Sequence, residues 1–114
     1  MPETIKSEIK LTIELDENRV PEKLYWDAPD GGISNQETKA LMLSVWDSKP
    51  QESMRIDLWT KDMPVDEMKH FFVDIIGSMS QTILTATNDQ VMADKMRALC
   101  QDLMQHIEAE QRQQ

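Results

Sequence analysis

Apolar and polar residues alternate in the first part of the chain. In residues 8–16 every second side chain is aliphatic, which is the period of a β-strand with one face in water. Residues 16–19 are turn formers, and residues 21–27 are short and aromatic enough to return as a second strand. Residues 28–36 are rich in Pro, Gly, Ser, Asn and Asp, so they predict a loop.

Residues 40–47 form a short, largely apolar run that fits either a strand or a buried helix. Residues 54–60 alternate cleanly, and the connecting residues 48–53 are typical of a turn. An antiparallel hairpin can place nearly all the aliphatic side chains on one face. The register that does so pairs Asp47 with Met54, Val45 with Ile56, Leu43 with Leu58 and Leu41 with Thr60. The pattern favours this hairpin, and a helix over residues 37–45 is the alternative.

After Met63 the apolar period changes from two to about 3.6, which indicates an amphipathic helix. Pro64 suits its first turn. Its apolar stripe consists of Val65, Met68, Phe72, Ile75, Met79, Ile83 and Ala86. Residues 87–89 break this helix, and Thr87 and Gln90 have the spacing of a capping box. A second helix follows to about residue 108, with a stripe of Met92, Met96, Leu99, Cys100, Leu103, Met104 and Ile107.

These elements predict one α+β domain over residues 1–114: an antiparallel four-stranded meander sheet with two C-terminal amphipathic helices packed on one face. The length suits a single core. The expected core residues are Leu11, Ile13, Leu43, Ile56, Leu58, Phe72, Ile75, Leu99 and Leu103.

Charge narrows the possible partners. The chain carries 21 acidic and 12 basic residues, a formal net charge of -9. Nucleic acid and anionic membrane surfaces would repel it, so neither is an expected partner. No apolar run is long enough to cross a membrane and no signal peptide is visible, so we expect a cytoplasmic protein. A single cysteine, Cys100, fits a reducing compartment, and we expect it to pack as a small apolar residue.

No pattern of a catalytic, cofactor or metal site emerges. His70 and His106 have no ligand or nucleophile at a recognised spacing, and surface or packing roles are expected. Asp62, Asp66 and Glu67 could hold a cation, but acidic residues at a helix start are favoured by the helix dipole alone. We expect no enzyme, no cofactor and no small-molecule substrate.

The tryptophans give the most specific indication of a binding surface. In the predicted register the hairpin face opposite the aliphatic one carries Met42, Trp46, Arg55 and Trp59, with Met42 opposite Trp59 and Trp46 opposite Arg55. Exposed aromatic patches commonly mark a protein partner or a homo-oligomer. The alternative is that each indole packs flat on neighbouring side chains and binds no partner. The nine methionines could also line an interaction groove, although core filling is the simpler role.

Four segments are distinctive: VPEKLYWDA at residues 20–28, ETKALMLSVWD at 37–47, DLWTKDM at 57–63 and DEMKHFFVD at 66–74. They resemble the GldC family, small gliding motility proteins of the Bacteroidetes. It implies a cytoplasmic accessory protein with no known enzymatic activity, and it brings no catalytic residues. We therefore expect an adaptor that supports gliding through protein contacts. The order of strands and helices is also similar to the SecB export chaperones, so a holdase linked to export is the alternative.

Overall fold

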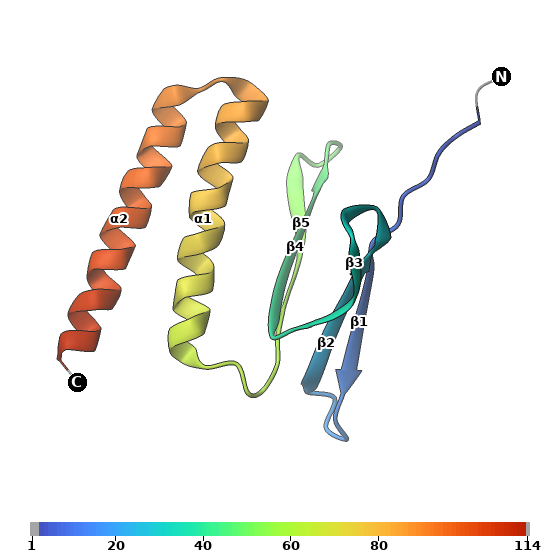
Figure 1. The fold of residues 1–114 in the computed structure, drawn as a ribbon. Helices are drawn as coiled ribbons and strands as arrows, with labels where there is room; N and C mark the ends of the chain where they lie inside the picture. Colours follow the sequence, from blue (N-terminus) through green and yellow to red (C-terminus); the bar gives the residue numbers. More distant parts are fainter. Residues whose placement is uncertain (1–2, 114) are drawn as a thin grey trace. The chain divides into compact units, whose positions relative to one another are not determined.

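A computed structural model describes residues 3–113 of the chain. The chain divides into two compact units, Met1–Met63 and Pro64–Gln114, and each is described by itself. The first holds all five strands and the second holds two long helices (Figure 1). An α+β protein with antiparallel strands and two C-terminal helices is thus confirmed. The single four-stranded meander is wrong, because the strands form one three-stranded and one two-stranded sheet. Packing of the helices on a sheet face stays a prediction, as does a single domain.

The three-stranded sheet has the order β1-β2-β3. Its strands are β1 Lys10–Leu15, β2 Pro21–Ala28 and β3 Ile33–Thr38. Ile13 lies opposite Leu24 on β2, and Leu24 lies opposite Thr38 on β3. The predicted turn between the first two strands is confirmed, with Arg19 in the left-handed region at φ 63°. The central strand carries Leu24, the largest side chain of the described chain that is fully buried.

The predicted loop over residues 28–36 is wrong for its second half, which begins β3. Only Pro29–Gly31, a single 3₁₀ turn, and Gly32 connect the strands, and Gly32 has φ 76°, a conformation that glycine adopts without strain. The remaining residues of β3 are polar and their side chains are mostly exposed. Backbone pairing with β2, and not burial of apolar side chains, holds the strand in the sheet. A strand of this kind has no apolar alternation by which a sequence would reveal it.

Strands β4 Ala40–Asp47 and β5 Glu52–Trp59 form the second sheet, so the hairpin is confirmed and the alternative helix over residues 37–45 is wrong. The register is shifted by two residues from the predicted one. Val45 lies opposite Met54, Leu43 opposite Ile56 and Leu41 opposite Leu58. The shift arises because the turn is shorter than predicted, so that Asp47 already pairs with Glu52. The Asp47 carboxylate accepts from the Lys49 backbone N–H at 3.1 Å and tightens this turn.

Residues Thr60–Asp62 join the two sheets. The Thr60 backbone N–H donates to the carbonyl of Lys39, between β3 and β4, at 2.8 Å, and the Lys61 N–H donates to the carbonyl of Pro21 at 3.1 Å. The Lys61 ammonium also lies 3.0 Å from Asp16 in the β1–β2 turn. Thr60 is only 2 % exposed. The segment DLWTKDM therefore contains the joint that fixes the end of β5 to the other strands.

The second unit is an antiparallel hairpin of α1 Val65–Thr87 and α2 Gln90–Arg112. Both predicted helices are confirmed, and α2 continues beyond the predicted end near residue 108. Asn88, in the left-handed region at φ 60°, ends α1. The predicted capping box of Thr87 and Gln90 is wrong. Asp89 is the N-cap of α2, and its carboxylate accepts from the Met92 backbone N–H at 2.9 Å.

The helices meet through small side chains. The Cys100 thiol lies against Gly77 and donates to the carbonyl of Val73 at 3.6 Å. Ser80 and Ala93 are buried. Because none of these side chains is large, the two helix backbones can approach closely. The apolar stripe predicted for α1 lies to the side of this contact, with Phe72 46 % and Met79 50 % exposed.

The predicted core is wrong for most of its members. Leu11, Ile13, Leu43, Ile56, Phe72 and Leu99 are exposed, and the other three are half-buried. Among the described hydrophobic residues, only Leu24, Ala93 and Ile107 are buried. The prediction assumed that each aliphatic face had a covering layer, and neither unit supplies such a layer by itself.

Candidate functional site

Met42, Trp46, Arg55 and Trp59 lie on one face of the β4–β5 hairpin, which we call the tryptophan face. Side chains alternate between faces with a period of two, so a register shift of two residues leaves every side chain on its predicted face. The indoles of Trp46 and Trp59 are 61 % and 54 % exposed. The position of the four residues in the hairpin is thus as expected, whereas their role as an interface stays a prediction.

The two indoles mark opposite ends of the tryptophan face. Trp46 lies opposite Ser53 beside the hairpin turn, and Trp59 lies opposite Ala40 at the other end of the strands. At about 3.4 Å per strand residue, this places them about 20 Å apart. The predicted pairs of Met42 with Trp59 and of Trp46 with Arg55 are wrong. The face is therefore a strip with an aromatic anchor at each end rather than one compact aromatic cluster.

Arg55 occupies the middle of this strip and lies opposite Ser44. Its guanidinium lies 3.2 Å from the carboxylate of Asp57 and donates to the Met42 sulfur at 3.8 Å. Arg55 thus contacts Met42 and Asp57 instead of pairing with Trp46 as predicted. A guanidinium held by one neighbouring carboxylate keeps further N–H donors for a partner, because it has five.

A shallow groove of about 250 Å³ begins at the Trp59 end of the face. It lies between the start of β2 and the end of β5, where the joint described above brings these strands together. Its lining consists of Val20, Pro21, Asp57, Leu58, Trp59 and Lys61. A mostly apolar lining with one exposed indole and only two charged side chains, Asp57 and Lys61, suits a protein side chain better than a charged metabolite.

The opposite face of the hairpin is also apolar and exposed, which the sequence prediction missed by assigning it to the core. Val45, Met54 and Ile56 are 54 %, 65 % and 54 % exposed. A two-stranded hairpin alone is marginally stable in water, and this one has exposed apolar side chains on both faces. The alternation of residues 54–60 was informative about the faces, but it could not reveal whether either face is covered.

The polar residues considered as chemical sites have ordinary partners. Asp62 is held by Lys39 at 2.8 Å and by the Thr60 hydroxyl at 2.6 Å, which together lower its pKa to about 2. His106 lies 3.2 Å from Glu110, and His70 is exposed. Within the described chain, no three His, Cys, Asp or Glu side chains come together as metal ligands would.

The helical unit has a small apolar hollow of about 220 Å³ between its two helices. Its walls are Lys69, Phe72, Val73, Leu103, His106 and Ile107. The Lys69 ammonium spans its edge to Glu110 at 2.9 Å and lowers the pKa of that carboxyl group. The hollow offers little polar recognition. Among residues 3–113, no helix has the length and apolar character needed to cross a membrane.

The antiparallel strands, the two helices and the exposed apolar side chains of the β4–β5 hairpin define the class: a small α+β protein with exposed apolar surfaces. The model of the GldC-like family, described as gliding motility-associated protein GldC-like, matches residues 21–109. The chain therefore belongs to this family, as its resemblance to GldC implied. No curated protein and no solved structure matches the chain.

Proposed function

We propose that this protein is a non-enzymatic cytoplasmic adaptor that supports gliding motility by binding another protein through the tryptophan face. Membership of a gliding motility-associated family supports gliding as the cellular process. The observation that carries the proposal is the exposure of Trp46 and Trp59 on one face of the same hairpin. Aromatic side chains are enriched among the residues that dominate binding energies, so they are the first candidates for the contact.

The chemistry of the face supports a protein partner over a small molecule. Each indole can remove about 150–250 Å² from water when it is covered. Arg55 and Asp57 lie between the two indoles and provide donors and acceptors for orientation. A standard interface buries about 800 Å² on each side. Two aromatic side chains about 20 Å apart can both lie within a contact of this size.

The test is a crosslinked pull-down from native cells, with the wild-type chain compared with a Trp46→Ala, Trp59→Ala double variant. We expect the wild type to retain one or two folded proteins in stoichiometric amounts and the double variant to lose them. A matched control is the Val45→Ala, Met54→Ala variant, because this pair lies on the opposite face of the same hairpin and is similarly exposed. Equal recovery of partners by all three proteins would contradict the proposal.

A holdase of SecB-like architecture is the second candidate, and one observation favours it. Apolar side chains are exposed on both faces of the hairpin and on α1, as for Ile56 and Met79. Such surfaces suit unfolded clients of varied sequence. A holdase would suppress aggregation of unrelated model proteins at stoichiometric ratios. Loss of that activity in both the tryptophan variant and its opposite-face control would favour the holdase, because an adaptor needs only one face.

A further inference from the structure

Strand β4 is the edge of a sheet of only two strands. The Thr60 N–H donates to the Lys39 carbonyl, so this pair of residues bonds inward, between the two strands. Bonding direction alternates along an antiparallel pair. Met42, Ser44 and Trp46 therefore direct their backbone N–H and C=O groups out of the free edge of β4. Within residues 3–113, these backbone groups have no hydrogen bond to another strand or loop.

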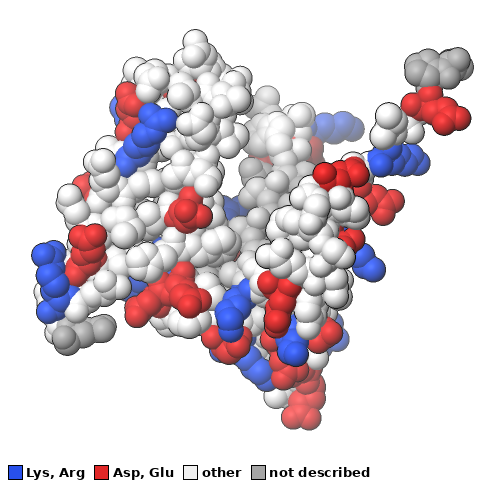
Figure 2. All heavy atoms as spheres, viewed as in Figure 1, with Lys and Arg blue, Asp and Glu red and all other residues white. Residues whose placement is uncertain are grey.

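The free edge of β4 lacks the features that protect edges in natural proteins, which are charges, prolines and bulges. The other free edges of the two sheets each have such a feature. Strand β1 carries Lys10 and Glu14 and ends in a bulge, β3 pairs irregularly with β2, and β5 has three charged side chains. Figure 2 shows charged side chains gathered where the β1–β2 turn lies. Strand β4 has no charge before Asp47, no proline or glycine and a regular register.

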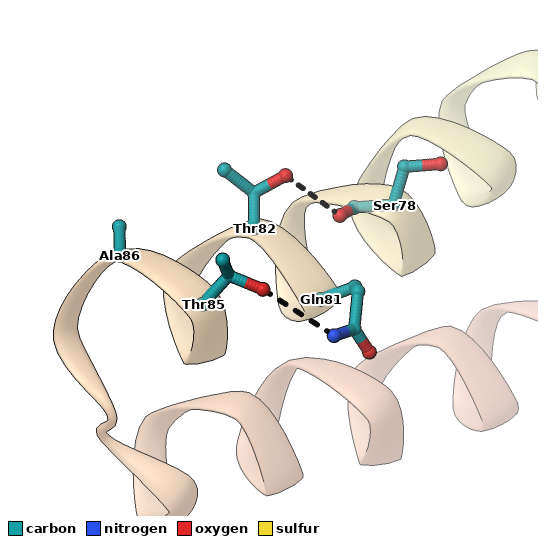
Figure 3. A pocket seen from close by; sticks show the side chains of 5 residues that line it. All are labelled: Ser78, Gln81, Thr82, Thr85 and Ala86. Atoms are coloured by element: carbon teal, nitrogen blue, oxygen red, sulfur yellow. Dashed lines mark hydrogen bonds between the residues drawn. The ribbon is translucent and has the colours of Figure 1, made fainter.

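The helical unit has an uncharged surface of a different kind. A shallow groove of about 430 Å³ on α1 is lined by Ser78, Gln81, Thr82, Thr85 and Ala86 (Figure 3). The Gln81 amide donates to the Thr85 hydroxyl at 3.4 Å, and the Thr82 hydroxyl donates to the Ser78 carbonyl at 3.2 Å. These local contacts select no kind of partner. An unpaired strand edge does select one, because only another extended segment can match its row of N–H and C=O groups.

We propose that the partner of the tryptophan face adds an extended segment to the free edge of β4 as a third, antiparallel strand. The proposal rests on the proposed function for the place of binding, and it names the kind of segment that binds. Every second side chain of the segment lies on the tryptophan face, beside Met42 and Trp46. The alternate side chains lie beside Leu41, Leu43 and Val45, which selects aliphatic residues.

The chain does not supply this third strand itself. Its other described strands are already placed in the two sheets. Its helices cannot pair with the edge, because backbone groups within a helix bond to one another. A two-stranded hairpin is marginally stable in water, and a third strand strengthens such a sheet.

Charge selects a basic segment from a partner over a second copy of this chain. Each copy has a net charge of -9, so two copies repel each other, whereas a segment with Lys or Arg is attracted. The indole of Trp46, which is 61 % exposed, also attracts a cation through its ring face. The expected segment therefore alternates basic side chains on the tryptophan face with aliphatic side chains on the opposite face.

The direct probe is a synthetic peptide of alternating Val and Lys residues, matched in length to β4. Added to the wild type, it should slow hydrogen exchange at the backbone N–H groups of Met42, Ser44 and Trp46, measured by NMR. Protection of these N–H groups before any peptide is added would overturn the proposal, because the chain would then cover its own edge.

Two N-methylated versions of this peptide separate strand pairing from attraction by charge, since both keep the charge. With the Lys side chains on the tryptophan face, the Lys N–H groups point at β4 and the Val N–H groups point away. Methylation of the Lys amides should therefore weaken binding about tenfold or more, and methylation of the Val amides should leave it unchanged. Equal binding of the two methylated peptides would overturn the proposal.

Two proline variants test the same edge in the protein. Ser44→Pro removes an N–H from the free edge of β4, and Ser53→Pro, its matched control, removes one from the opposite edge of the same hairpin. The first should lose the peptide and the second should keep it, with circular dichroism confirming that each is folded. If Ser44→Pro does not fold, Ser44→Lys repels the basic segment instead, with Ser53→Lys as its control. Wild-type binding by a folded Ser44 variant would overturn the proposal.

The pull-down separates this proposal from the proposed function. A partner kept by the Ser44 variants but lost by the Trp46→Ala, Trp59→Ala variant would overturn strand addition and leave the tryptophan face as the interface. A partner lost by the Ser44 variants but kept by the tryptophan variant would support strand addition and contradict the tryptophan face. Self-association of the wild type that Ser44→Pro abolishes would assign the edge to a second copy, and so would overturn the proposal.

Discussion

The ammonium group of Lys39 lies 2.8 Å from a carboxylate oxygen of Asp62, across 23 residues of sequence. Lys39 is the single residue between β3 and β4, and Asp62 follows the end of β5. The other Asp62 oxygen accepts from the hydroxyl of buried Thr60 at 2.6 Å. The ion pair therefore closes the strand unit at the point where its two sheets meet.

This contact predicts an acid-sensitive joint. The pKa of Asp62 is lowered from 3.8 to about 2, first by Lys39 and then by Thr60. A carboxylate whose pKa is lower in the folded state stabilises the fold above its unfolded pKa, and loses that contribution as pH falls through the folded value. Stability should therefore decline as pH falls from about 4 towards 2, and Asp62→Asn should flatten the decline. Urea midpoints measured between these values test this.

The exposed carboxylate of Glu17, in the β1–β2 turn, provides the control as Glu17→Gln. Asp16 and Lys61 form a second pair at the same joint, and the pKa of Asp16 is lowered by the Val20 N–H and by Lys61. Asp62→Asn should thus reduce the pH dependence without abolishing it. A pH profile identical to the wild type would show that the Lys39–Asp62 pair does not persist in solution.

Leu24 should be the most sensitive apolar position of the strand unit. It is 0 % exposed on the central strand of the three-stranded sheet, whereas Leu43 is 41 % exposed. Leu24→Ala should lower the free energy of unfolding by about 2–5 kcal/mol. Leu43→Ala should cost about 1 kcal/mol, since a large part of its side chain stays in water after folding. Equal losses in urea unfolding would mean that the aliphatic hairpin face is covered in solution.

The sequence was informative wherever one periodicity dominated. Strand β1 and both helices follow from alternation and from the 3.6-residue period. Strand β3 did not follow, because Ser34, Asn35 and Gln36 carry no apolar alternation. The tryptophan face survived an error of two residues in register, since such a shift preserves faces. Burial of Leu43 and Phe72 could not be predicted, because it depends on whether another layer covers them, and a periodic pattern does not contain that information.

Asp89 should control the start of α2. Its carboxylate accepts from the Met92 N–H, one of the donors that have no partner within the helix. Asp89→Ala should therefore lower the free energy of unfolding by about 1 kcal/mol. Gln90→Ala, at the position once expected to complete a capping box, should change it by less than about 0.5 kcal/mol. Thermal unfolding followed by circular dichroism distinguishes the two, and the reverse order of effects would contradict the assigned cap.

The last prediction concerns how the two indoles divide the binding energy of a partner. Trp46 and Trp59 lie about 20 Å apart, and substitutions separated by more than about 10 Å usually act independently. If one partner spans the face, Trp46→Ala and Trp59→Ala should each weaken binding by about 2 kcal/mol, and the double variant should lose the sum. Calorimetric titration of the captured partner into the four proteins measures this. A loss confined to Trp59→Ala would restrict the contact to the groove beside Val20 and Pro21, with Trp46 left in water. Binding unchanged in both single variants and in the double variant would remove the tryptophan face as the interface.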